Sequence, residues 1–128
     1  MNLLLDTHVA LWAITDSPRL SAEARALLLA PTTTLWVSAV SLWEIAIKHS
    51  LGRGDMPIDA AQALGWFRAS GYQLLAVEAE HCVAIAGLAN HHADPFDRML
   101  IAQALTEPLR LLTHDQQLAR YSDTVILI

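Results

Sequence analysis

The chain opens with Asn2-Leu3-Leu4-Leu5-Asp6-Thr7, a short apolar run closed by an acidic and a hydroxyl residue. The apolar run is typical of a buried strand, and Asp6-Thr7 is typical of a helix start, so we expect a helix over residues 8–14. A strand that passes directly into a helix is the first half of a β-α-β unit. The fold class therefore depends on whether this pattern is repeated.

The strand and helix pattern recurs along the whole chain. Further strands are predicted from apolar, β-branched and aromatic runs at residues 33–37, 72–77, 109–113 and 124–128. Capping residues and helical periodicity predict helices at residues 22–28, 41–50, 59–70, 78–89, 96–105 and 115–121. Alternation of this kind implies parallel strands with right-handed helical crossovers. We therefore predict an α/β fold, a three-layer α/β/α sandwich with a parallel sheet of about five strands.

Length and composition predict one domain that stays out of the membrane. The 128 residues are 54% hydrophobic, but no apolar run approaches the ~20 residues of a membrane span. No repeat, linker or P-loop motif divides residues 1–128. The first apolar run is too short for a signal peptide and Cys82 is the only cysteine, so we expect a cytoplasmic protein. The apolar excess predicts an exposed patch that serves a homodimer, a protein partner, or both.

The net charge of −5 argues against a protein that coats nucleic acid through a broad basic surface. Acidic residues gathered around a metal ion would lower the net charge and still serve phosphate chemistry. A nucleic-acid substrate is therefore compatible with this composition only if the acids are clustered.

Four acids are expected to lie at one edge of the predicted sheet. Asp6 and Asp115 directly follow the first and fourth strands, and the carboxyl ends of parallel strands share an edge. Asp97 falls in the first turn of its helix and Glu44 early in another, and both helices can begin near that edge. Carboxylates brought together repel one another unless a cation neutralises them. Hard oxygen ligands without cysteine favour Mg²⁺, for which Mn²⁺ can substitute.

Each of these acids also has an ordinary structural interpretation. Asp6 and Asp115 are suited to be helix N-caps, and Glu44 can close a capping box with Ser41. Asp97 is suited to the first turn of a helix, where the helix dipole favours a negative charge. For any one acid alone the structural interpretation is the more common, so the metal site rests on the four together.

Four segments carry a more specific pattern: Leu5-Asp6-Thr7-His8 with Leu11-Trp12, Val37-Ser38 followed by Ser41-Leu42-Trp43-Glu44-Ile45-Ala46-Ile47-Lys48, Asp94-Pro95-Phe96-Asp97-Arg98 running into Leu100-Ile101-Ala102-Gln103-Ala104, and Leu112-Thr113-His114-Asp115. Together they span nearly the whole chain. In these segments the sequence resembles the PIN-domain ribonucleases, specifically the VapC-type toxins of bacterial and archaeal toxin–antitoxin pairs.

The resemblance implies roles for individual residues. Asp6, Glu44, Asp97 and Asp115 match the family's metal-binding, catalytic acids. Thr7 and Thr113 match the accompanying hydroxyl positions, and Asp94 is a further, supporting acid. The implied reaction is hydrolysis of RNA by a metal-activated water, generally leaving a 5′ phosphate, and a cognate antitoxin protein blocks the site. The chain departs from related sequences in the loop at residues 51–57, which has a second glycine and an aspartate where a basic and apolar pair is usual.

Basic and aromatic residues supply weaker predictions. Lys48, Arg53 and Arg98 are candidates to contact the RNA backbone, with Arg98 preferred because it adjoins Asp97, although each is equally compatible with an ordinary surface charge. The spacing of the histidines matches no standard zinc motif, so they are expected to be solvated loop residues rather than ligands of a zinc hydrolase. These histidines are His8, His91, His92 and His114. The tryptophans are expected in the core or an interface rather than stacked on bases; they are Trp12, Trp36, Trp43 and Trp66.

Two other functions remain as alternatives to a metal-dependent endoribonuclease. A phospho-accepting receiver domain is similar in length and fold, but it needs paired acids after the first strand and a lysine late in the sheet. Here Asp6 has no acidic neighbour and no lysine follows Lys48. A non-catalytic interaction module with the same fold is the second alternative, and the presence of all four acids argues against it.

Overall fold

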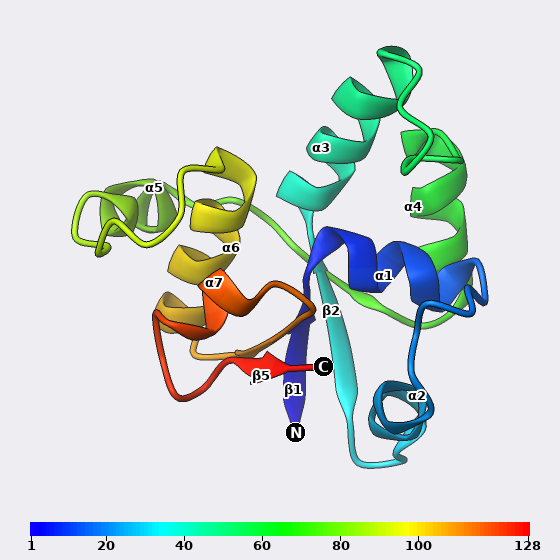
Figure 1. Ribbon diagram of the computed structural model, residues 1–128, viewed down its shortest axis with the longest axis horizontal. Helices are drawn as coiled ribbons and strands as arrows, with labels where there is room; N and C mark the ends of the chain where they lie inside the picture. The colour runs from blue at the N-terminus through cyan, green and yellow to red at the C-terminus, as the bar shows by residue number, and fades with distance from the viewer.

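A parallel sheet of five strands forms the centre of the computed structural model, which describes residues 1–128 (Figure 1). The strands are β1 (Asn2–Leu5), β2 (Thr34–Ser38), β3 (Gln73–Leu75), β4 (Arg110–Thr113) and β5 (Ile126–Leu127), in the spatial order β3-β2-β1-β4-β5. The helices are α1 (Thr7–Ile14), α2 (Ala22–Leu29), α3 (Ala39–Ser50), α4 (Ala60–Ala69), α5 (Ala79–Ile85), α6 (Pro95–Thr106) and α7 (Gln116–Ala119). All four strand pairings are parallel, as predicted.

The sheet is covered on both faces, which confirms the three-layer architecture. Successive residues of a strand point to opposite faces, so Leu3 and Leu5 join one core and Leu4 joins the other. The first core packs the sheet against α1, α2 and α4, and the second packs it against α6 and α7 (Figure 1). Helix α3 contributes to both, since Ile45 belongs to the first core and Val40 to the second.

The ends of several elements differ from the prediction. Helix α3 begins at Ala39 rather than Ser41, because the Ser38 hydroxyl accepts the Val40 N–H at 3.0 Å and caps the helix. The predicted strands at 72–77 and 124–128 shorten to β3 and β5, which lie at the two edges of the sheet and have a neighbour on one side only. The predicted helix at 78–89 ends at Ile85.

None of the helices is both long enough and apolar enough to cross a membrane.

Candidate metal centre

The central strands β1 and β4 end at a point where the chain changes direction across the sheet. After β1 the chain builds β2 and β3 on one side, and it returns to place β4 on the other side of β1. In open α/β sheets such a switch point leaves a crevice beyond the carboxyl ends of the strands, where ligands bind. Asp6 follows β1 and Asp115 follows β4, so these two acids flank this crevice.

Asp6 is fixed between the first helix and the neighbouring strand. Leu5 is paired with Leu112, which brings the next residues, Asp6 and Thr113, side by side. The buried Thr113 hydroxyl donates to Asp6 Oδ2 at 2.5 Å. Asp6 Oδ1 accepts the His8 N–H at 3.2 Å and caps α1. Asp6 therefore caps a helix and also flanks the crevice beyond the strand ends.

Asp115 is held in a similar way. Its Oδ1 accepts the Gln117 N–H at 2.8 Å and caps α7, while its own N–H donates to the Thr113 hydroxyl at 3.0 Å. Asp115 Oδ2 lies 2.8 Å from Nε2 of His92. A single threonine thus links the two acids that follow the central strands.

Helix α6 supplies two more acids from its first turn. Asp94 is the N-cap, and its Oδ1 accepts the N–H groups of Phe96 and Asp97 at 2.8 and 3.1 Å. Pro95, at the first helical position, suits this cap because it has no N–H to satisfy there. Asp97 then projects Oδ2 to within 3.3 Å of His92 Nε2.

Glu44 reaches the same place from α3. The capping box with Ser41 does not form, because α3 begins before Ser41 and the Ser41 hydroxyl instead hydrogen-bonds to Thr7 at 2.8 Å. Glu44 is only 3% exposed, and its Oε2 pairs with Lys48 one turn later. Its Oε1 has no hydrogen-bond partner. A buried carboxylate oxygen without a partner is costly, so this atom is suited to a cation.

These side chains line one cavity of about 310 Å³. Its walls are Asp6, His8, Trp12, Glu44, Lys48, Asp94, Asp97, His114 and Asp115. The structure therefore brings together all four acids proposed as ligands, from four different elements of the chain, together with the supporting acid Asp94.

The acids of this cavity oppose one another's ionisation. Burial, reinforced by the negative charges of Asp6, Asp94, Glu44 and Asp115, raises the pKa of Asp97 from its ordinary value of 3.8 to about 8. Burial also raises the pKa of Asp6, although the Thr113 hydrogen bond opposes that change. Clustered carboxylates, together with the unpartnered Glu44 oxygen, fit a hard divalent cation such as Mg²⁺ or Mn²⁺.

The predicted hydroxyl and basic residues are placed unequally. Thr113 contacts an acid directly, whereas the Thr7 hydroxyl contacts only Ser41. Among the three residues predicted to contact the RNA backbone, only Lys48 lines the cavity. Arg53 pairs with Asp55 at 3.1 Å.

Arg98 lies outside the acidic cavity in spite of its place beside Asp97. Its guanidinium donates to the main-chain oxygens of Ile85, Ala89 and His92 at 3.1–3.3 Å, and to the Tyr121 hydroxyl at 3.2 Å. Arg98 therefore holds the segment before α6 rather than facing the cavity.

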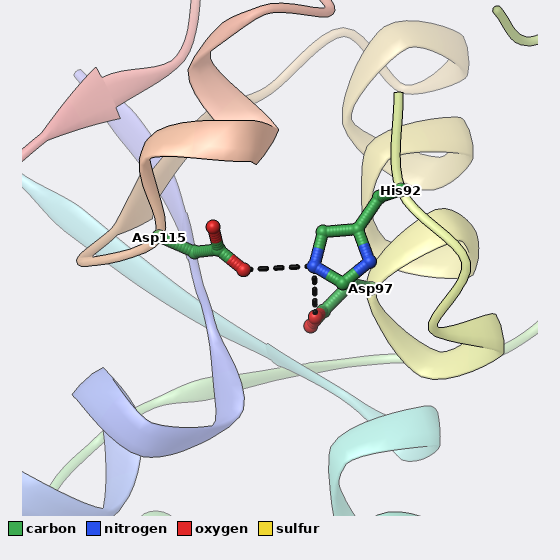
Figure 2. Close-up of side chains that lie close together, drawn as sticks. All are labelled: His92, Asp97 and Asp115. Atoms are coloured by element: carbon green, nitrogen blue, oxygen red, sulfur yellow. Dashed lines mark hydrogen bonds and ion pairs between the residues drawn. The ribbon is translucent and has the colours of Figure 1, made fainter. Parts of the chain in front are cut away.

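Three histidines of the site were missed by sequence reasoning: His8 and His114 line the cavity, and His92 contacts two of its acids. His92 was expected to be a solvated loop residue, yet its Nε2 contacts both Asp97 and Asp115 (Figure 2). The only sequence signal for His92 was its position two residues before Asp94, the cap of the helix that carries Asp97. His8 was also expected to be free, but its Nε2 lies 3.1 Å from Asp55 Oδ2.

The chain is similar to known proteins in sequence and in fold. The model of the PIN domain family matches residues 3–123. Ribonuclease VapC22 of Mycobacterium tuberculosis is 30% identical over 120 residues, which are 91% of this chain and 89% of that protein. VapBC2 from Rickettsia felis, bound to a DNA fragment from its promoter, matches with a TM-score of 0.72 and 21% identity over 100% of this chain and 98% of that chain. A toxin–antitoxin complex from Klebsiella pneumoniae matches with a TM-score of 0.65 and 14% identity over 97% and 95%. The structural likenesses confirm the predicted fold.

Proposed function

Since the chain belongs to the PIN-domain family, we propose that it is a metal-dependent endoribonuclease of the VapC type, the toxin of a toxin–antitoxin pair. The observation that carries this proposal is the convergence of Asp6, Glu44, Asp97 and Asp115 on one cavity at the carboxyl edge of the sheet. The receiver-domain alternative has no support from the family match. Both cores pack on one sheet, which supports a single domain over residues 1–128.

The four acids would hold Mg²⁺, or Mn²⁺ in its place. When bound, such an ion lowers the pKa of a water molecule and stabilises the negative charge that builds up on a phosphodiester during hydrolysis. The protein's own contribution is to fix the acids before substrate arrives. Thr113 holds Asp6, Lys48 holds Glu44, and the helix N-terminus of α6 holds Asp94 and places Asp97. Carboxylates fixed in this way need little rearrangement, which favours catalysis.

A second cavity suggests a course for the RNA strand. It measures about 320 Å³ and shares His8 and Trp12 with the acidic cavity. Its other walls include the exposed Arg19, which can attract a phosphate that the acidic cavity repels. Lys48 would contact the phosphate at the reaction site itself. Arg98 instead holds the loop before α6. Arg53 remains a candidate to contact the RNA, because its partner Asp55 lines this second cavity.

The proposed partners are a cognate antitoxin and a second copy of this chain, in the cytoplasm. Exposed apolar side chains support a protein interface, above all Trp43, Ile47 and Leu51, which follow one another at four-residue spacing along α3 and its C-cap. We call these three residues the α3 stripe. The free thiol of Cys82 suits a reducing compartment.

RNA cleavage with and without metal tests the proposed function. A labelled RNA should be cut by the protein in Mg²⁺, and the cleavage should stop on addition of EDTA. Asp6→Asn and Asp97→Asn should each lower the cleavage rate roughly a hundredfold or more, because losing a ligand removes several kcal/mol of transition-state stabilisation.

The control is Asp59→Asn. Asp59 caps α4 away from the acidic cavity, and asparagine is an equally good N-cap, so this variant should cleave at the native rate. Equal cleavage by the native chain and by both site variants would point to a contaminating nuclease. Binding of RNA without any cleavage would favour the non-catalytic interaction module.

A further inference from the structure

One nitrogen atom of His92 faces two of the proposed metal ligands (Figure 2). His92 Nε2 lies 2.8 Å from Asp115 Oδ2 and 3.3 Å from Asp97 Oδ2. The three side chains are close enough to hold a metal ion together. The imidazole can therefore have one of two roles, as a nitrogen ligand of the metal or as a hydrogen-bond donor to Asp115.

The other ring nitrogen decides between these roles. His92 Nδ1 accepts the main-chain N–H of Asp94 at 3.0 Å. A nitrogen that accepts a hydrogen bond carries no proton, so the proton of the neutral ring is on Nε2. Coordination through Nε2 would require the proton on Nδ1. That proton would point at the Asp94 N–H, and two donors cannot form a hydrogen bond. His92 in this position is therefore a donor and not a ligand.

The loop that carries His92 is fastened on both sides of the residue. The His92 N–H donates to the Tyr121 hydroxyl at 2.9 Å, and the His92 carbonyl accepts from Arg98 at 3.3 Å. Arg98 also donates to the Tyr121 hydroxyl at 3.2 Å, which closes the network. The ring is consequently held beside Asp97 and Asp115, and a change of ring orientation would break the hydrogen bond from the Asp94 N–H.

From this geometry we propose that His92 is a positioning residue of the metal site. Its Nε2–H donates to Asp115 and orients that carboxylate beside Asp97, whose Oδ2 lies 3.3 Å from the same nitrogen. The acids then keep an all-oxygen ligand set that favours Mg²⁺ or Mn²⁺ over Zn²⁺. The proposal rests on the proposed function, because it takes the four acids to be metal ligands. It goes beyond that function by assigning a residue outside the set of acids.

Metal titration of three proteins tests this role. The affinities of the native chain, His92→Ala and His92→Gln for Mn²⁺ and for Zn²⁺ are measured by calorimetry. His92→Ala should lower the Mn²⁺ affinity about 10- to 100-fold, the usual effect of losing a partner that orients metal ligands. His92→Gln should restore most of it, because the glutamine amide supplies an N–H at a similar reach. The loss for Zn²⁺ in His92→Ala should be no larger than that for Mn²⁺.

The matched control is His91→Ala, which removes an imidazole from the same loop. The rings of His91 and Tyr121 pack in a T-shaped arrangement, and no hydrogen bond or ion pair joins His91 to the acids, so its removal should leave the Mn²⁺ affinity unchanged. An equal loss in His91→Ala and His92→Ala would mean that the loop alone matters, and would overturn the proposal. A larger loss for Zn²⁺ than for Mn²⁺, without rescue by glutamine, would overturn it in favour of a nitrogen ligand.

The native chain separates failure of this inference from failure of the proposed function. If the native chain binds Mn²⁺ and His92→Ala binds it equally well, only the role of His92 is wrong. If the native chain binds no Mn²⁺, the metal site is wrong and the role of His92 is lost with it.

Discussion

At the scale of single residues, two aspartates of the acidic cavity divide their oxygens between a helix and the cavity. Asp6 and Asp115 each use Oδ1 to cap a helix, through the N–H groups of His8 and Gln117. The second oxygen, Oδ2, contacts Thr113 in the case of Asp6 and His92 in the case of Asp115. The two interpretations of these acids, as helix caps and as site residues, are therefore compatible. A capped carboxylate is also an oriented one, so the cap helps to position the site.

The raised pKa of Asp97 predicts how the metal-free protein responds to pH. The carboxyl group keeps its proton up to about pH 8 in the folded protein but loses it near its ordinary pKa of 3.8 when unfolded. The folded state binds more protons between these values, so its stability should fall as pH rises through this window. In EDTA, the free energy of unfolding should decrease from pH 5 to pH 8, and Asp97→Asn should reduce this decrease by on the order of 1–3 kcal/mol. Chemical denaturation at several pH values measures both.

Asp59→Asn is the control for this pH dependence. Asp59 caps α4 and lies outside the acidic cavity, and asparagine keeps the cap. The slope between pH 5 and pH 8 should therefore be native in this variant. An unchanged slope in Asp97→Asn would contradict the raised pKa.

At the scale of elements, α3 connects the core, the acidic cavity and the surface. Its start at Ala39, after the Ser38 cap, turns Glu44 and Lys48 toward the cavity and the α3 stripe toward solvent. A helix shifted in register would move all of these side chains together. The Ser38 cap is consequently important for the site as well as for stability.

Ser38→Ala tests this connection. Loss of the cap should lower the free energy of unfolding by about 1 kcal/mol, measured by chemical denaturation, and should weaken Mn²⁺ binding through Glu44. Ser21→Ala removes an equivalent cap from α2, which has no residue in the acidic cavity. It should cost similar stability and leave the Mn²⁺ affinity unchanged. A similar loss of affinity in both variants would show that general loosening, and not α3, is responsible.

At the scale of the whole molecule, the α3 stripe is an exposed apolar surface whose residues do not line the acidic cavity. Trp43 and Leu51 are 59% and 72% exposed, although apolar side chains of this size are usually covered. Trp12 and Trp36 pack against the two cores as expected. Trp43 and Trp66 are exposed, which leaves the predicted interface and not the core as their place. Association of two copies through α3 would remove this surface from water.

Leu51→Glu tests the proposed homodimer. A charge in the α3 stripe should halve the mass measured by sedimentation equilibrium and leave the fold intact, because Leu51 is exposed in the single chain. Val83→Glu is the matched control, since Val83 is 74% exposed on α5 and lies outside the stripe. Its mass should remain that of the native protein. If both variants keep the native mass, α3 is not the dimer interface.

Local patterns in the sequence were sufficient to predict the fold class and the meeting of the acids at one edge of the sheet. The apolar run before Asp6, and its repetition before Asp115, predicted a parallel sheet, and the rule that carboxyl ends share an edge predicted that these acids meet. Such patterns are carried by neighbouring residues, so they can be read without the rest of the chain. The ends of β3 and β5 could not be read in this way, because they depend on how far each edge strand finds a partner.

The tertiary structure alone decided which atoms touch within the site. Thr113 meets Asp6 across 107 positions of sequence, and His92 meets Asp115 across 23. No periodicity or capping rule connects residues so far apart, so His92 was expected in solvent and Arg98 was expected at the RNA. Hydrogen bonding and the pKa of a carboxyl group depend on distances of a few ångströms in space, and folding sets those distances between segments whose sequences carry no sign of one another.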